Sequence, residues 1–195
     1  MKFWRFAVLV LVVGLGAFGC ALQPSNEDGW IALIDGASGL ENWNRIGDAN
    51  WRSEAGAVAA NAGNGYLVSK RTFRNFRLRA EFWADDDTNS GIFLRVGKPG
   101  EITPTSSYEV NIFDRRPDPS YGTGAIVGVA KVIPSPRVSG QWNTYDITAR
   151  GTHIVVTLNG TRTVDIEDAS FAAGPIALQA AGGTIKWRLL KVQPL

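Results

Sequence analysis

The sequence predicts an all-β protein built as a sandwich or jelly roll of two stacked antiparallel sheets. Strand signals recur from Gly29 to the end of the chain, whereas helical periodicity is nearly absent. Short apolar segments alternate with turn residues at regular spacing, which is typical of sandwiches and jelly rolls. Alternating segments occur towards both ends of this region, as two stacked antiparallel sheets require.

The first half of the domain supplies three strand signals. Residues 30–34 form a short apolar run that ends at the turn Asp35-Gly36. Residues 51–60 contain a turn at Glu54-Ala55-Gly56. Between Phe76 and Trp83, apolar residues alternate with mostly charged ones, which predicts a strand with one buried face.

The second half continues the pattern with four further strand segments. They are residues 142–148, 153–158, 176–179 and 184–192. Asn159-Gly160 predicts a type I′ hairpin turn, because both residues tolerate the positive φ angles that this turn needs. Two segments rich in Pro, Gly or Ser, 97–107 and 115–139, show no pattern and are expected to be functional or mobile loops.

Residues 1–20 have the features of an export signal. Lys2 and Arg5 precede an apolar run over residues 6–15, which is too short for a comfortable membrane span. The chain's only cysteine, Cys20, ends a segment that resembles the bacterial lipobox, in which the cysteine is acylated and anchors the protein to a membrane. We therefore expect a lipoprotein of the periplasm or outer membrane, the alternative being a secreted protein cut by the ordinary signal peptidase.

The remaining chain divides into a short tether and one domain. Residues 21–28 are polar, contain Pro24 and are interpreted as the tether, and residues 29–195 are long enough for one domain with its own core. Without Lys2 and Arg5 the basic residues fall from 20 to 18 and equal the 18 acidic ones. This neutral balance argues against a general nucleic-acid binder. The oligomeric state stays open.

Two segments, 89–95 and 108–114, indicate where a ligand would bind. Side chains of a strand alternate between its faces, so Ile92, Val110 and their apolar neighbours would face the core. The opposite face would then carry an aromatic ring, a guanidinium, a carboxylate and an amide, from Phe93, Arg95, Glu109 and Asn111. That combination suits a sugar better than a plain solvated surface.

An ordered set of short motifs resembles the bacterial 3-keto-disaccharide hydrolase domain over residues 29–192. The matching pieces are Gly29-Trp30, Leu33-Ile34-Asp35-Gly36, Trp43, Trp51, Asn89 to Arg95, Tyr108 to Asp114, Thr123 to Ile126, Trp142-Asn143, Leu158-Asn159-Gly160 and Gly174 to Gln179. The resemblance implies a concanavalin A-like jelly roll related in shape to β-glucanases. It also implies a disaccharide or glycoside substrate that is already oxidised to a ketone at carbon 3.

The chain departs from the family pattern at several positions. The family often has Gln where Asn111 stands, Tyr where Val127 stands, and an acidic residue and His soon after Gln179, where this chain has Ala180-Ala181-Gly182. Arg188 is followed by Leu189, where the family usually has Asn. These departures favour the alternative of a non-catalytic carbohydrate-binding module, and a structural protein of the cell envelope is a third hypothesis.

The implied reaction gives the candidate residues their roles. A 3-keto group acidifies the hydrogen on carbon 2, so a base can remove it, the group on carbon 1 can leave, and hydration of the enone completes a net hydrolysis. Glu109 is the candidate base and Arg95 the group that stabilises the enolate. Asn111 and Gln179 are candidates to bind hydroxyls, and Trp83, Phe93 or Trp187 to stack on the sugar. The plain alternative is an exposed cross-strand ion pair between Arg95 and Glu109, worth under ~1 kcal/mol.

Acidic residues supply the remaining candidates. Glu109 to Asp114 is similar to the Glu-x-Asp-x-x-Glu motif of β-glucanases, so Asp114 is a substrate-binding candidate. However, residues five apart share a face only across a β-bulge, which argues against a retaining glucanase. The run Asp85-Asp86-Asp87 is interpreted as a solvated hairpin turn, the alternative being a calcium site. We predict no cofactor, with a divalent cation left open.

Overall fold

The computed structural model describes Met1, residues 29–98 and residues 100–195. The predicted export signal, the tether and the acylation of Cys20 fall on residues 2–28, outside the described residues, and stay predictions. In the described part, no helix is long and apolar enough to cross a membrane. The described domain is nearly all-β, with two short 3₁₀ turns, η1 (Leu40–Asn42) and η2 (Pro119–Tyr121).

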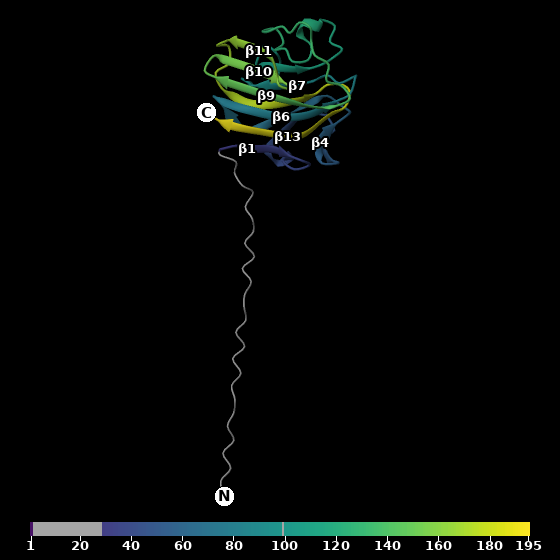
Figure 1. The fold of residues 1–195 in the computed structure, drawn as a ribbon. Helices are drawn as coiled ribbons and strands as arrows, with labels where there is room; N and C mark the ends of the chain where they lie inside the picture. Colours follow the sequence, from purple (N-terminus) through teal and green to yellow (C-terminus); the bar gives the residue numbers. More distant parts are fainter. Residues whose placement is uncertain (2–28, 99) are drawn as a thin grey trace.

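The larger sheet contains eight antiparallel strands. In spatial order they are β11 (Thr161–Glu167), β10 (His153–Leu158), β9 (Trp142–Arg150), β6 (Phe76–Ala84), β13 (Ile185–Pro194), β4 (Ala57–Ala60) and β3 (Arg52–Glu54). The eighth strand, β1 (Ile31–Asp35), pairs with the second half of β13. The long strands β6 and β13 lie side by side at the centre of this sheet (Figure 1).

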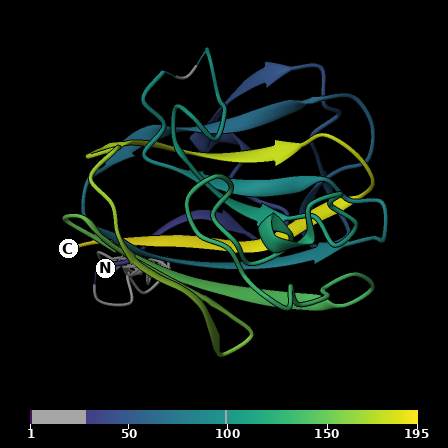
Figure 2. The same ribbon diagram turned by 90° about the horizontal axis from the view of Figure 1, so that it is seen from above.

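The smaller sheet contains five antiparallel strands. Their order is β2 (Trp43–Gly47), β5 (Gly65–Phe73), β12 (Gly174–Ala180), β7 (Ser90–Leu94) and β8 (Tyr108–Ile112). Seen from above, the two sheets form two layers that face each other (Figure 2). The predicted all-β sandwich of two antiparallel sheets is therefore confirmed.

The core fills the space between the two sheets. Along β6, buried residues from Phe76 to Ala84 alternate with more exposed ones, so the predicted one-sided strand is confirmed. Phe82 of this strand packs against Trp187 of β13, with ring centroids 5.7 Å apart. Leu67, Ile92 and other apolar residues close the core from the smaller sheet.

Predicted turns account for much of the connectivity. Asn159 and Gly160 have φ angles of 49° and 80°, as the predicted type I′ hairpin requires. The predicted turn at Ala55-Gly56 joins β3 to β4, and residues 97–107 and 115–139 are largely irregular segments, as predicted.

The sandwich has two ends that differ in what they carry. At one end, which we call the terminal end, the turn between β5 and β6 contacts the C-terminus, because Leu195 N–H donates to the carbonyl of Asn75 at 3.0 Å. Gly29, the first residue of the described domain, lies against Gln193 at the same end (Figure 1). The turn between β6 and β7, with Asp85, Asp86 and Asp87, lies at the other end, called the distal end.

Candidate functional site

The outer face of the smaller sheet carries a candidate site that extends over four neighbouring strands, β5, β12, β7 and β8. Tyr66 of β5 pairs with Gln179 of β12, and Gly91 of β7 pairs with Asn111 of β8. The pairing of Leu178 with Ile92 places Gln179 beside Gly91, so these four residues form one row across the sheet. Glu109 lies in the next row, opposite Phe93. We call Tyr66, Gly91, Glu109, Asn111 and Gln179 the Glu109 site.

Strand alternation on β8 follows the prediction. Val110 and Ile112 belong to the core between the sheets. Glu109 and Asn111 therefore project from the opposite face, although both are buried because irregular segments cover it. The carbonyl of Ile102, from segment 97–107, accepts a hydrogen bond from Tyr66 Oη at 3.2 Å.

Glu109 is the chemically distinctive residue of the site. Its side chain is buried, with only 5 % of the residue exposed. Among the described residues, its carboxylate has no hydrogen bond and no ion pair closer than 4 Å. Burial raises the pKa of Glu109 from 4.5 to about 7, and the nearby positive charge of Arg116 lowers it in part. Near neutral pH the carboxylate is therefore poised to take up a proton.

A glycine leaves room beside that carboxylate. A Cβ atom at Gly91 would lie 3.4 Å from Cγ and 3.6 Å from Oε1 of Glu109, and 3.0 Å from the carbonyl oxygen of Val110. The side chain of Glu109 therefore leans over Gly91, between Asn111 on one side and Gln179 on the other. Any larger residue at position 91 would therefore press on the side chain of Glu109.

Two amide side chains complete the site with unpaired oxygens. Asn111 Nδ2 donates to the carbonyl of Tyr121 at 2.7 Å, and Gln179 Nε2 donates to Tyr66 Oη at 3.4 Å. In both residues the amide oxygen is buried without a hydrogen-bond partner among the described residues. Because a buried acceptor without a partner costs about 1–3 kcal/mol, both oxygens favour a ligand that brings hydroxyl donors.

The prediction that Arg95 shares a face with Glu109 is wrong. Arg95 has a φ of 53°, so the strand ends before it and the period-two alternation no longer applies. The side chain is 1 % exposed, and its guanidinium donates to three backbone carbonyls, those of Arg74, Gly151 and Phe171. Arg95 therefore joins three connecting segments to each other and is not free to stabilise an enolate.

None of the three aromatic candidates is placed for stacking on a sugar at this site, and Trp83 lies on β6 of the other sheet. Trp187 is fully buried in the core between the sheets, so its predicted role in substrate binding is wrong. Phe93 does lie on the face of Glu109, but it is 1 % exposed and packs with Val68 and Ile102. The ring of Phe93 packs edge-to-face with the ring of Tyr66, with the ring centroids 5.5 Å apart, and so supports the site.

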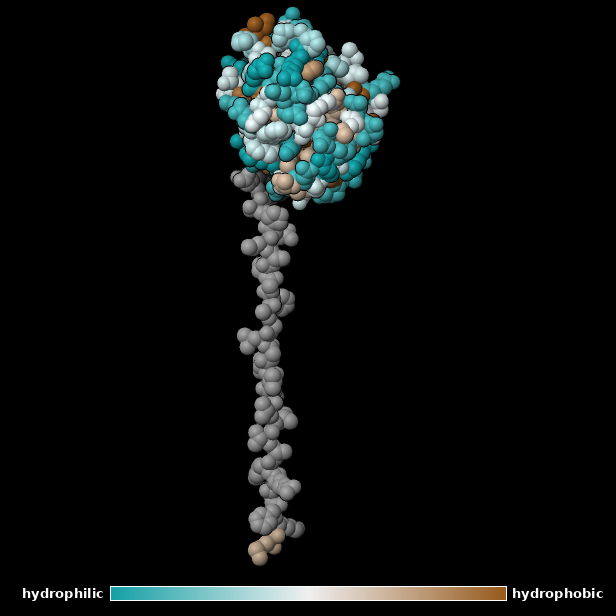
Figure 3. All heavy atoms as spheres, turned by 90° about the vertical axis from the view of Figure 1, so that its right-hand side faces the viewer, coloured by the Kyte–Doolittle hydropathy of each residue, from teal (hydrophilic) through white to brown (hydrophobic). Residues whose placement is uncertain are grey.

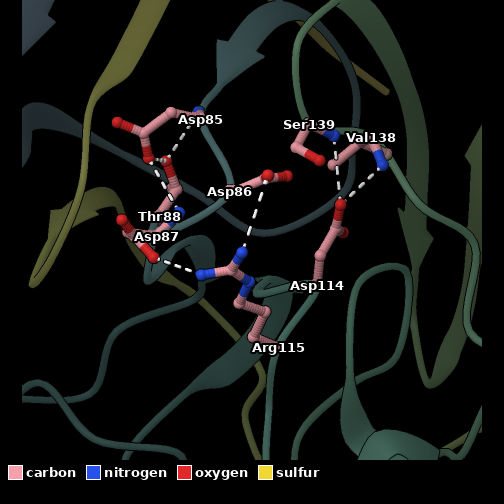
Figure 4. A network of polar contacts seen from close by, with 8 residues as sticks. All are labelled: Asp85, Asp86, Asp87, Thr88, Asp114, Arg115, Val138 and Ser139. Atoms are coloured by element: carbon pink, nitrogen blue, oxygen red, sulfur yellow. Dashed lines mark hydrogen bonds and ion pairs between the residues drawn. The ribbon is translucent and has the colours of Figure 1, made fainter.

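Asp114 also has a structural role, because both oxygens of its carboxylate accept hydrogen bonds from the protein. One oxygen accepts from the Thr123 hydroxyl at 2.6 Å, and the other accepts from Val138 N–H at 2.9 Å and Ser139 N–H at 3.0 Å (Figure 4). Both oxygens are thus used to hold the long segment after β8. The prediction that Asp114 contacts substrate has no geometric support.

The acidic run forms a turn, as predicted, but not a hairpin, because it joins β6 of the larger sheet to β7 of the smaller sheet. Asp85 accepts from the hydroxyl of Thr88 at 2.8 Å and from Thr184 N–H at 2.8 Å, which closes the turn. Asp86 and Asp87 pair with Arg115 (Figure 4). In the described part of the chain, no three His, Cys, Asp or Glu side chains gather as a metal site would require.

Sequence reasoning missed Tyr66, Gly91 and Arg116. Tyr66 and Gly91 join the site through strand pairing between distant segments, which local patterns do not reveal. Arg116 lies in an irregular segment just after β8, and only the folded path of that segment brings its charge to Glu109.

Comparison with solved structures identifies similar folds. Two candidate glycosyl hydrolases from Parabacteroides distasonis superpose with TM-scores of 0.74 and 0.72, at 16% and 25% identity. The aligned regions cover 86% and 85% of this chain, and 94% and 99% of those chains. A carbohydrate binding module from Bacillus subtilis superposes with a TM-score of 0.57 at 15% identity, covering 85% of this chain and 95% of that one.

Comparison of the sequence with protein families gives one match over nearly the whole described domain. No curated protein sequence matches the chain. The predicted concanavalin A-like jelly roll is confirmed by the sheet topology and the structural neighbours. The profile of the 3-keto-alpha-glucoside-1,2-lyase-like domain matches residues 29–193, which confirms the predicted resemblance. The chain therefore belongs to the 3-keto-alpha-glucoside-1,2-lyase-like domain family.

Proposed function

We propose that this protein cleaves 3-keto-disaccharides or other 3-keto-glycosides, with Glu109 as the base that removes the proton from carbon 2. The observation that carries the proposal is the buried, unpaired carboxylate of Glu109, whose pKa is raised to about 7. A general base is most effective when its pKa lies near the working pH. Membership of the family adds the class of substrate.

The proposed reaction needs only the proton chemistry of this site and water. Glu109 takes the hydrogen from carbon 2, and the electrons of that C–H bond form the enolate of the 3-keto group. Collapse of the enolate breaks the bond from carbon 1 to the leaving oxygen, which takes up a proton. Addition of water to the resulting enone then gives the free 3-keto sugar, so the net change is hydrolysis.

Other side chains of the site would orient the sugar. The unpaired amide oxygens of Asn111 and Gln179 would accept hydrogen bonds from hydroxyl groups on either side of the ring above Gly91. Arg116 replaces Arg95 as the candidate that stabilises the enolate, because its positive charge already acts on Glu109. We propose the bacterial cell envelope as the location of this activity, on the basis of the expected export signal and lipobox.

A non-catalytic carbohydrate-binding module is the second candidate. Ala180-Ala181-Gly182 stand where the family often carries an acidic residue and His, next to Gln179 of the site. The similarity to a carbohydrate binding module concerns the fold, which suits either function. Both candidates use the same amide oxygens, so they differ only in whether Glu109 moves a proton.

Turnover of 3-keto-disaccharides distinguishes the two candidates. The chain from Ala21, which keeps the whole described domain, is incubated with 3-keto-disaccharides and the release of 3-ketoglucose is followed. We expect release by the wild type, rising with pH through about 7 as Glu109 loses its proton. Glu109→Gln should abolish release.

The matched control is Glu41→Gln, which removes an exposed carboxylate outside the site. It should release 3-ketoglucose at the wild-type rate. If Glu109→Gln keeps the wild-type rate, Glu109 is not the base. If the wild type releases nothing but still binds the ketosugars, the protein is a binding module.

A further inference from the structure

The terminal end of the sandwich carries more positive charge than negative charge. Lys70, Arg71, Arg74, Arg77 and Arg150 are all exposed there, and none has an ion-pair partner among the described residues. We call these five residues the basic end. They come from β5, from the turn between β5 and β6, and from the adjacent strands β6 and β9.

Exposed arginines elsewhere in the described domain are commonly paired. Arg52 pairs with Glu54, Arg79 with Asp146, Arg162 with Asp165, and Arg188 with Glu81. The contrast shows that the basic end is a local excess of charge, even though the chain without its first 20 residues is neutral overall.

The residues of the basic end are close to one another. Lys70, Arg71 and Arg74 line one open hollow of about 600 Å³ beside Ile31 and the C-terminal Leu195. Arg77 pairs with Thr148 across β6 and β9, which makes Arg150, two residues further on, its diagonal neighbour on the same face.

The cations at this end outnumber the carboxylates beside them. The charge of Arg74 lowers the pKa of buried Arg95, in addition to the larger effect of burial. Three carboxylates lie nearby, and two of them already serve local structure. Asp168 accepts from the Tyr108 hydroxyl at 2.7 Å, and Glu167 accepts from the Thr152 hydroxyl. The third is the C-terminal carboxylate of Leu195, so five cations face three anions.

We propose that the basic end docks on a membrane surface that contains anionic phospholipids. Exposed, unpaired cations on one end of a domain are the electrostatic complement of phosphate headgroups, and clusters of four to eight such residues beside a membrane anchor are typical of lipid recognition. Docking of this electrostatic kind does not require a flat apolar surface on the protein. The opposite end, which Figure 3 shows, is mostly hydrophilic and has no broad apolar patch.

The place where the described domain begins favours a membrane as the partner of the basic end. The described domain begins at Gly29 against Gln193, at the same end as the five cations. The segment from the expected acylated Cys20 to Gly29 spans nine Cα–Cα steps, which reach at most about 30 Å. An anchor of that length would keep the basic end within about 30 Å of the bilayer, so that the cations can reach its surface. This proposal is independent of the catalytic role of Glu109.

Vesicle binding tests the proposal without the anchor. The purified chain from Ala21 is mixed with vesicles of phosphatidylcholine alone or of phosphatidylcholine with phosphatidylglycerol, and bound protein is measured by sedimentation. We expect binding only to the anionic vesicles, weakening as salt is added. The triple variant Lys70→Gln, Arg71→Gln, Arg74→Gln should lose on the order of 100-fold in partitioning, roughly fivefold per cation.

A matched triple variant provides the control. Arg52→Gln, Arg162→Gln and Lys186→Gln remove the same charge at the distal end, and should change partitioning less than about twofold because these residues lie beyond the screening distance. Equal losses in both triples, equal binding to neutral vesicles, or no binding to anionic vesicles would overturn the proposal. Binding to a soluble sulfated polysaccharide but not to vesicles would assign the basic end to a glycan instead. Release of 3-ketoglucose at the wild-type rate by the triple variant Lys70→Gln, Arg71→Gln, Arg74→Gln would verify independently that this variant is folded.

Discussion

Replacing Glu109 by Gln should make the protein more stable at alkaline pH, although it removes the proposed base. Burial raises the pKa of Glu109 to about 7, whereas the unfolded chain has the ordinary value of 4.5. Between these two values the folded state holds a proton that the unfolded state has lost. The contribution of Glu109 to the free energy of unfolding is therefore fully present below pH 4.5 and is lost as the pH rises through 7.

The magnitude follows from the same two pKa values. The difference between about 7 and 4.5 corresponds to roughly 3 kcal/mol, because one pH unit is worth about 1.4 kcal/mol. Glu109 is 5 % exposed, so solvent screening reduces this figure little. Ionised Glu109 would thus cost the folded state roughly 3 kcal/mol above pH 8, a substantial part of the stability of an ordinary domain.

Urea unfolding at pH 4.5 and pH 8.5 measures the effect directly. The difference in unfolding free energy between Glu109→Gln and the wild type should move by roughly 3 kcal/mol in favour of the variant between the two pH values. Glu41→Gln is the control for loss of a carboxylate. A difference that stays constant between the two pH values would refute the argument that burial holds Glu109 partly protonated.

Four further substitutions test the site, the role of Arg95 and the core. Gly91→Ala should lower 3-ketoglucose release at least tenfold, because the new Cβ crowds the side chain of Glu109 at 3.4 Å. The free energy of unfolding in urea should fall by only about 1–3 kcal/mol. Unchanged release would show that crowding at position 91 does not affect the base. Arg95→Met should destabilise the fold by roughly 3 kcal/mol in urea unfolding, since three carbonyls lose their donor; a loss of activity without a loss of stability would contradict its structural role. Trp187→Ala should cost about 3–5 kcal/mol and Trp142→Ala under about 1 kcal/mol in thermal unfolding; equal costs would contradict the assigned core.

Local patterns predicted most of the strands because each depends on neighbouring residues alone. The alternation along β6 and the Asn159-Gly160 turn are written in adjacent positions, and both are confirmed. The same alternation placed Glu109 and Asn111 on one face correctly. Trp187 was assigned wrongly although the signal was present, since Lys186 and Arg188 on either side of it mark the solvent face of β13.

The remaining errors have a non-local origin. Arg95 was misplaced because its left-handed backbone ends β7, and nothing in the adjacent side chains reveals that angle. Its partners are carbonyls of three distant segments, so its burial depends on the whole fold. Tyr66 likewise joins Gln179 across strands more than a hundred residues apart, and only the register of the sheet brings them together.

The decisive experiment is the release of 3-ketoglucose from 3-keto-disaccharides. We expect release by the chain from Ala21, a rate that rises with pH through about 7, and loss of release in Glu109→Gln but not in Glu41→Gln. Release that continues unchanged in Glu109→Gln would contradict the assignment of the base. A wild-type chain that releases nothing would contradict the proposed activity altogether.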